Sequence, residues 1–181
     1  MTRRILVTYG TKHGSTREVA ETVAEALNGL GVDVTTRPAG EIDDLAPYTG
    51  VVIGGALYTG RWHRDSVRFL KTHRSSLESM PVAVFAIGPQ TAERHDLEAS
   101  RAQLDKALER FPGIRPRAVA VFGGVIDPDA LRFPFSRMPA SDARDWEAIR
   151  AWAEEIAAAF GYGKAASNAR DHRNELQQTP R

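Results

Sequence analysis

The chain has no cysteine among its 181 residues. Disulfide bonds, thiolate metal ligands and a cysteine nucleophile are therefore excluded from any mechanism. It also has no apolar run that approaches the roughly 18 residues of a membrane-spanning helix. The apolar stretch that follows the first four residues is too short for a secretory signal. We expect a cytoplasmic protein with at most peripheral membrane association.

An excess of charge of one sign is missing too. Lysine and arginine together number 24 and aspartate and glutamate 23, which gives a net charge of +1. No nucleic-acid-binding motif accompanies the basic residues, so we expect no nucleic-acid partner. The five histidines are dispersed without a zinc-binding spacing, so no metal site is predicted. A hydrophobic fraction of 42% and this length suit one domain with a full core.

The segment 7–16 joins an apolar strand to an amphipathic helix through a loop rich in glycine and hydroxyl groups. A helix N-terminus binds anions through its unpaired N–H groups and its dipole. The loop is neither a Walker motif, which needs wider glycine spacing and a Gly-Lys pair, nor a dinucleotide fingerprint, which needs a third glycine. We therefore predict a site for one terminal monophosphate group. The candidate ligands are Thr11, Lys12, His13, Gly14, Ser15 and Thr16.

Ser15 and Glu18 also match a capping box, in which a serine and a glutamate three residues later satisfy the first N–H groups of a helix. This alternative needs no ligand. It does not account for Thr11 or for the two glycines that let a ligand approach the backbone, so the phosphate interpretation is favoured.

Apolar runs and amphipathic segments alternate along the chain. Strands are predicted at 5–9, 32–37, 51–54, 82–87 and 118–122. Helices are predicted at 16–30, 65–73, 96–111 and 142–160. This alternation predicts an α/β fold whose parallel sheet is covered on both faces. In such a sheet, ligands bind beyond the carboxyl ends of the strands.

Two segments carry a resemblance to a known family. The stretch 9–16 resembles the phosphate loop of the flavodoxin family, whose pattern is Ser/Thr, two variable residues, Gly, one variable residue and Thr. Thr11, Gly14 and Thr16 match this pattern. The stretch 51–63 resembles a strand and flavin loop of the menaquinone-dependent protoporphyrinogen oxidase branch of that family.

The resemblance implies a three-layer flavodoxin-like fold over residues 1–160, with a five-stranded parallel sheet in the order 2-1-3-4-5. It implies flavin mononucleotide (FMN) as the cofactor, with its ring between the loops after the third and fourth strands. The implied ring-binding residues are Ala56, Leu57, Tyr58, Thr59, Gly60, Gly88, Pro89 and Gln90. The flavin would carry the chemistry, so no catalytic side chain is assigned. Residues 161–181 lack apolar periodicity, and we expect a disordered tail there.

Phospho-receiver domains share this fold order. They need acidic residues after the first strand and an aspartate at the end of the third. Those places hold Tyr9-Gly10 and Gly54-Gly55 here, so the receiver interpretation is excluded.

Two features near the second loop have alternative interpretations. Tyr58 or Trp62 is expected to stack on the flavin, while Trp62 could equally pack beneath the following helix. A group of basic side chains, which follows the loop, would attract porphyrin carboxylates or anionic lipid headgroups, or would form a solvated helix face. The group consists of Arg61, His63, Arg64, Arg68 and Arg74.

The resemblance implies an oxidoreductase of haem biosynthesis that oxidises protoporphyrinogen IX, with a small molecule or quinone as redox partner. The alternative is a non-enzymatic electron carrier that docks redox proteins, and a net charge of +1 weakens it because such carriers are markedly acidic. The segment 128–139 is short where the oxidase branch carries a long basic insertion, so the porphyrinogen and quinone partners stay open. A flavin-free regulatory domain is a third interpretation.

Overall fold

The computed structural model describes residues 3–12, 14–88, 93–126 and 140–162. Its main sheet has five parallel strands in the spatial order β2-β1-β3-β5-β6. The strands are β1 (Arg4–Gly10), β2 (Asp33–Pro38), β3 (Gly50–Tyr58), β5 (Val82–Ile87) and β6 (Ala118–Phe122). This is the predicted order 2-1-3-4-5, so the flavodoxin-like fold class is confirmed.

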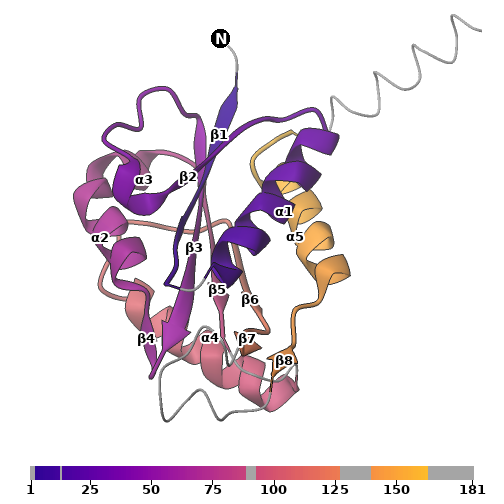
Figure 1. The fold of residues 1–181 in the computed structure, drawn as a ribbon. Helices are drawn as coiled ribbons and strands as arrows, with labels where there is room; N and C mark the ends of the chain where they lie inside the picture. Colours follow the sequence, from indigo (N-terminus) through magenta and orange to yellow (C-terminus); the bar gives the residue numbers. More distant parts are fainter. Residues whose placement is uncertain (1–2, 13, 89–92, 127–139, 163–181) are drawn as a thin grey trace, which may run out of the picture.

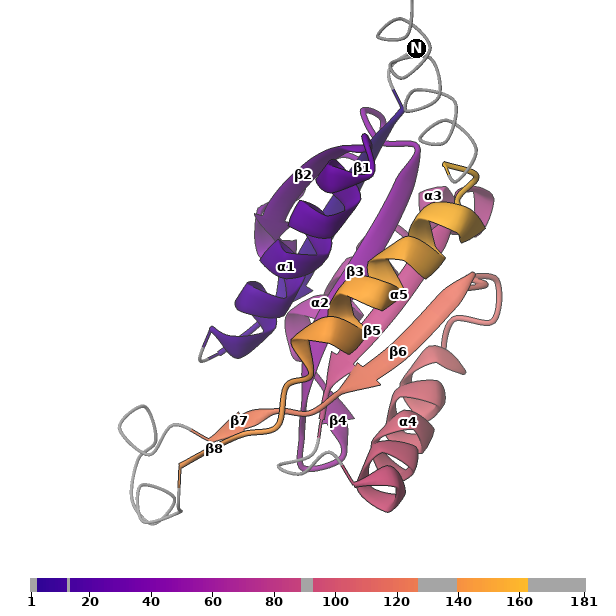
Figure 2. The ribbon, with the colours of Figure 1, turned by 90° about the vertical axis from the view of Figure 1, so that its right-hand side faces the viewer.

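Helices cover both faces of the sheet and make three layers (Figures 1 and 2). One face carries α1 and α5, and the opposite face carries α2, α3 and α4. The helices are α1 (Ser15–Gly29), α2 (Arg64–Thr72), α3 (Arg74–Ser79), α4 (Arg94–Leu108) and α5 (Trp146–Ala159), and a short 3₁₀ helix spans Ala39–Glu41.

Alternation along the strands builds two cores from one sheet. Ile5 and Val7 of β1 belong to the core under α1 and α5, whereas Leu6 belongs to the core under α2 and α3. Successive side chains of a strand point to opposite faces, so a strand covered on both sides must be apolar throughout. All six residues of β5 are buried, in agreement with the continuous apolar run there.

Three short strands were not predicted. β4 (Arg61–Trp62) folds back against β3, and β7 (Val125–Ile126) pairs with β8 (Ser141–Asp142). All three lie near the edge at which the parallel strands end, the lower edge in Figure 1. Two-residue strands give too little periodicity to be found in a sequence.

All four predicted helices have different bounds in the structure: 16–30 and 65–73 are shifted by one residue, and 96–111 begins two residues earlier and ends three earlier than predicted. The helix predicted from residue 142 begins at Trp146, because the Asp145 carboxylate accepts the N–H of Ala148 across 2.9 Å and acts as its N-cap. The helix predicted to end at residue 73 is followed directly by α3, whose Leu77 is fully buried. Of the predicted tail 161–181, only Gly161 and Tyr162 are described, and the backbone N–H groups of both bond to the end of α5.

Candidate functional site

The register of the sheet brings the predicted binding segments to one edge. Gly10 at the end of β1 pairs with Gly55 in β3, and Ala56 pairs with Ile87 at the end of β5. The loop after β1, the end of β3 and Gly88 are therefore neighbours, as expected of strand ends in a parallel sheet. The predicted ligands His13, Pro89 and Gln90, and the segment 128–139, lie outside the described residues.

The loop after β1 is closed by a contact between Thr11 and Gly14. The backbone N–H of Gly14 donates to Oγ1 of Thr11 across 3.0 Å. Gly14 has a φ of 90°, in the left-handed region that only glycine adopts readily, and it is the N-cap of α1. No described side chain caps this helix, so its first N–H groups are available to an anion.

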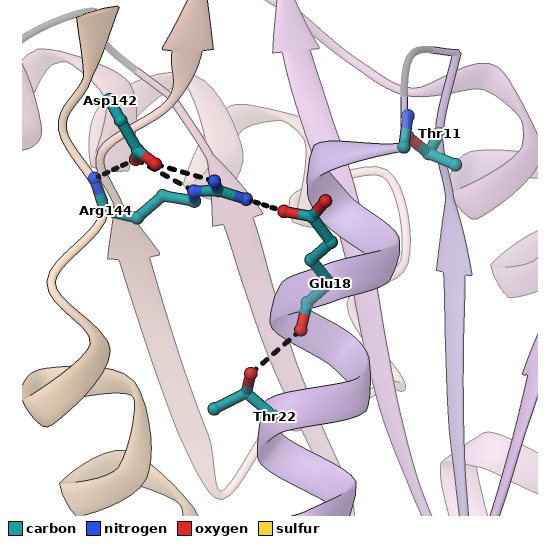
Figure 3. A network of polar contacts seen from close by, with 6 residues as sticks. Thr11, Glu18, Thr22, Asp142 and Arg144 are labelled. Carbon is teal, nitrogen blue, oxygen red and sulfur yellow. Dashed lines mark hydrogen bonds and ion pairs between the residues drawn. The ribbon is translucent and has the colours of Figure 1, made fainter.

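The capping box at Ser15 and Glu18 does not form. The left-handed turn at Gly14 already supplies the N-cap, so Ser15 is the first helical residue and comes one position too late to cap. The Glu18 side chain bonds to Arg144 instead (Figure 3). The alternative that needed no ligand is therefore wrong.

The hydroxyl of Thr16, in the first turn of α1, is buried without a hydrogen-bond partner among the described residues. Thr16 is 0% exposed, and its Oγ1 has no hydrogen-bond partner among the described residues. Leaving a buried hydroxyl unpaired costs about 1–3 kcal/mol. The hydroxyls of Thr8 and Ser141 and the indole N–H of Trp152 are also unpaired within the described part of the chain, but Thr16 is the one in the first turn of a helix. A phosphate at this helix start would offer this hydroxyl an acceptor.

The predicted second loop is a tight β-hairpin. Leu57 pairs with Trp62 and Tyr58 with Arg61, which leaves a two-residue turn at Thr59 and Gly60. The turn residues have φ values of 46° and 75°, as a hairpin turn with two left-handed residues requires. The available sequence signal for this hairpin was weak: a Thr-Gly pair follows an apolar run, and the returning strand, Arg61–Trp62, is too short to show alternation.

Tyr58 joins this hairpin to the phosphate loop. Its side chain is 38% exposed, and it is the one exposed large hydrophobic residue among those described. Burial of its hydroxyl raises the pKa of Tyr58, and a hydrogen bond from the backbone of Lys12 acts in the opposite direction. The ring also contacts His63 edge-on, with 6.3 Å between the ring centres. Tyr58 therefore presents a partly exposed aromatic surface beside the loop after β1, and its stacking on a flavin stays a prediction.

Trp62 packs inside the protein. Its side chain is only 4% exposed, and its indole N–H donates to the carbonyl oxygen of Gly55 across 3.0 Å. Of the two interpretations of Trp62, the packing one is confirmed and the stacking one is wrong. The reason is the β4 strand, which turns Trp62 back onto the core that α2, α3 and α4 cover.

His63 is a site residue that sequence reasoning treated only as part of a basic group. Its Nδ1 accepts the backbone N–H of Asp65 across 3.2 Å and so caps α2. A Cβ on Gly10 would come within 2.5 Å of this nitrogen, so the ring lies directly against the end of β1. Burial lowers the pKa of His63, and the nearby Asp65 carboxylate only partly offsets this. A neutral imidazole therefore stands between the two predicted loops.

The side chains of the predicted basic group lie on different elements in the structure and have different partners. Arg64 contacts Asp65 across 3.6 Å, and Arg74 belongs to α3, where it pairs with Glu78 across 2.7 Å. Both ion pairs are at the surface, where such pairs contribute little to stability. Arg61 is exposed on β4, beside the end of β3.

A charged cluster from the far end of the chain reaches the first turn of α1. The guanidinium of Arg144 bonds to both carboxylate oxygens of Asp142, at 2.9 and 2.7 Å, and also to Glu18 (Figure 3). It lies over the Trp146 ring, 4.6 Å from the ring centre. Sequence reasoning missed this cluster, because 126 positions separate Glu18 from Arg144.

Histidine and acidic side chains do not gather into a metal site in the described parts of the chain. No group of three or more of them that could hold a metal ion is found within residues 3–12, 14–88, 93–126 and 140–162. Within those same ranges, no helix has the length and apolar character needed to cross a membrane.

Comparisons with known proteins agree with the fold described above. The family described as a flavodoxin domain matches residues 6–138. The chain belongs to this flavodoxin-domain family. It is similar to the protoporphyrinogen IX dehydrogenase [quinone] of Escherichia coli strain K12, with 27% identity over 179 residues, 85% of this chain and 94% of the relative. A protein of the same name from Leishmania major is 27% identical over 129 residues, 68% of this chain and 54% of that protein.

Solved structures with a similar fold include several flavodoxins. Oxidised flavodoxin 1 from Bacillus cereus superposes with a TM-score of 0.58 at 14% identity, over 86% of this chain and 97% of that one. The two-electron reduced flavodoxin of Megasphaera elsdenii gives a TM-score of 0.55 at 14% identity, over 85% of this chain and 98% of that one. At these identities the likeness establishes the fold, and a flavin cofactor is what the flavodoxin domain implies.

Proposed function

We propose that this protein is an FMN-dependent oxidoreductase that oxidises protoporphyrinogen IX and passes the electrons to a quinone. The family membership supports the flavin, and the relatives that carry the dehydrogenase name support the substrate. One structural observation carries the choice of a phosphate-bearing flavin. It is the buried, unpaired hydroxyl of Thr16 at the uncapped start of α1.

The residues at the start of α1 would hold the phosphate. The first N–H groups of the helix supply hydrogen bonds that a dianion accepts, and the helix dipole favours negative charge there. Thr16 adds a hydroxyl whose pairing with phosphate oxygen removes an unpaired buried group. The Thr11 side chain keeps the loop closed through its bond to Gly14. Ser15 is half-buried in the same turn, while Lys12 is exposed beside it.

The β3–β4 hairpin would position the ring. Bound FMN supplies the redox chemistry, because its ring accepts hydrogen or electrons from a substrate. Tyr58 offers it an aromatic face, and the hairpin holds Tyr58 in place through its pairing with Arg61. Ala56 and Gly88 lie at adjoining strand ends, where their backbone groups can approach the ring. His63, kept neutral by burial, adds no charge between the loops.

Positive charge beside the hairpin supports an anionic substrate. Arg61 and Arg64 are exposed next to the hairpin, and guanidinium groups bind carboxylates such as those of a porphyrinogen. The quinone as acceptor and the cytoplasmic location stay predictions.

The first experiment tests the cofactor. The purified protein is mixed with FMN, desalted, and its absorbance spectrum recorded, alongside a variant with both Thr11→Ala and Thr16→Ala. We expect a flavin spectrum that the parent retains and the double variant loses. Thr22→Ala is the matched control, because Thr22 lies on the same helix and bonds only to the carbonyl of Glu18 in the preceding turn. A parent protein that retains no flavin would contradict the proposal.

The second experiment tests the reaction. The FMN-loaded protein is given protoporphyrinogen IX with menaquinone, and the fluorescence of the product porphyrin is followed. Flavin-dependent turnover supports the dehydrogenase function. Reduction by a ferredoxin-type reductase without turnover of the porphyrinogen would support the electron-carrier alternative in its place.

A further inference from the structure

Glu18 places a negative charge beside the predicted phosphate site. Its backbone N–H bonds to the carbonyl oxygen of Gly14, so it closes the first turn of α1. A carboxylate in a first helical turn is favourable while the helix end is empty. The same carboxylate repels an incoming phosphate, because the two negative charges would share one end of the helix.

Arg144 is the cation that faces this carboxylate. Its side chain is only 10% exposed and is held on three sides, by Glu18, by Asp142 and by the Trp146 ring. Its neighbours in sequence fix its backbone: the Arg144 N–H donates to Asp142 across 3.0 Å, and Asp145 caps α5. The guanidinium is therefore positioned before any ligand arrives.

The other cation in the first turn of α1 is engaged elsewhere. Arg17 pairs with Glu21 one turn further along, with 2.7 Å between Nε and Oε1. Both side chains of that pair are largely exposed, so water screens them. Arg144 is the cation better shielded from water, and its bonds to Asp142 keep the guanidinium next to the Glu18 carboxylate.

We propose that Arg144 is a positioning residue for the phosphate group of the cofactor. It offsets the negative charge of Glu18 and keeps that carboxylate bonded to itself, so that the start of α1 accepts a dianion. This inference rests on the proposed FMN binding. It concerns a residue beyond the 6–138 segment that matches the flavodoxin domain. The effect is electrostatic, so it distinguishes a ligand with a phosphate from the same ligand without one.

The test compares FMN with riboflavin, which lacks the phosphate. Dissociation constants for both are measured by quenching of flavin fluorescence, at low and at high salt. Arg144→Gln is expected to weaken FMN binding by roughly threefold to tenfold at low salt and less at high salt, because salt screens charges. Riboflavin binding is expected to stay within about twofold, because riboflavin carries no charge for Glu18 to repel. A loss that is equal for both flavins, or no loss, would overturn the proposal.

A second variant separates charge from mechanical support. In Glu18→Gln combined with Arg144→Gln, the repelling carboxylate is gone and the contact between α1 and the segment before α5 is still cut. Recovery of FMN affinity to within about twofold of the parent is expected, because the repulsion is removed together with the cation that offset it. A double variant as weak as Arg144→Gln alone would show that Arg144 acts only by tying the two segments together, and would overturn the proposal.

Two further measurements complete the test. Arg4→Gln is the control, because Arg4 pairs with Asp33 across 2.8 Å at the start of β1, the end opposite the site, and this change should alter neither affinity. If Arg144→Gln fails to fold, Glu18→Gln alone decides: FMN should bind more tightly than to the parent at low salt, and equal or weaker binding overturns the proposal. A parent protein that binds no FMN overturns the proposed function and this inference with it.

Discussion

The indole N–H of Trp62 donates to the carbonyl oxygen of Gly55 across 3.0 Å, inside the protein. This bond fixes the short β4 strand against the end of β3, close to the point where the predicted ring-binding hairpin turns at Thr59. Gly55 has no room for a larger residue, because an added Cβ would lie 2.6 Å from the Trp62 Nε1. The two residues therefore depend on each other.

Trp62→Phe should lower the free energy of unfolding by about 1–3 kcal/mol, because it removes the buried hydrogen bond to the Gly55 carbonyl and part of a buried ring. Urea denaturation followed by circular dichroism measures the change. Trp146→Phe serves as the control, since that ring is only half-buried and its loss leaves no buried carbonyl unpaired among the described contacts. A variant as stable as the parent would contradict the structural role of Trp62.

Thr16→Val should change ligand binding and stability in opposite directions. Removing a buried unpaired hydroxyl is neutral or slightly stabilising for the free protein, while loss of a hydrogen bond to phosphate weakens FMN binding by about 1.5–3 kcal/mol, roughly 10- to 150-fold. Thermal unfolding and an FMN titration give the two quantities. Thr22→Val, on the exposed side of the same helix, should leave FMN affinity unchanged. Equal FMN affinity of Thr16→Val and the parent would show that Thr16 does not contact the phosphate.

Gly10→Ala should destabilise the protein by about 1–3 kcal/mol, because the new methyl group would meet the His63 ring at 2.5 Å and the Ser66 hydroxyl at 2.6 Å. Gly29→Ala is the matched control. No described atom lies within 4 Å of a Cβ at Gly29, and alanine stabilises a helix by up to about 1 kcal/mol relative to glycine. Chemical denaturation of both variants measures the difference, and a Gly10→Ala protein as stable as Gly29→Ala would refute the close packing of His63.

His63 should make the folded state sensitive to mild acid. Burial lowers the pKa of His63 in the folded protein, so between its lowered value and the ordinary value of 6.5 the unfolded chain binds more protons than the folded one. This contribution to stability is complete above the ordinary pKa of 6.5 and is lost as the pH falls through the lowered pKa. His63→Gln should flatten the dependence of the melting temperature on pH between about 7.5 and about 5.

His95→Gln is the control for this effect, because the His95 side chain is 92% exposed. Its melting temperature should follow that of the parent over the whole pH range. A parent and a His63→Gln protein with the same pH dependence would mean that His63 is not held neutral by its surroundings.

Much of the fold was predictable because its signals are local. The apolar run from Val82 to Ile87 is a strand buried on both faces, and the pattern Thr11-Gly14-Thr16 lies where a strand ends and a helix begins. The placement of Trp62 was not decidable from the sequence. A tryptophan after a flavin loop suits stacking and packing equally, and the two-residue β4 strand settled it.

The amino-acid sequence by itself determined the layered α/β fold with its parallel strands, and it placed a loop rich in glycine and hydroxyl groups between the first strand and the first helix, because these follow from periodicity and from residues close together along the chain. Tertiary structure alone decided that the Thr16 hydroxyl is buried with no partner among the described residues, that the Tyr58 ring is partly exposed, and that Arg144 meets Glu18. Such contacts depend on how α5 packs beside α1, and no pattern within either segment encodes a pairing between residues so far apart.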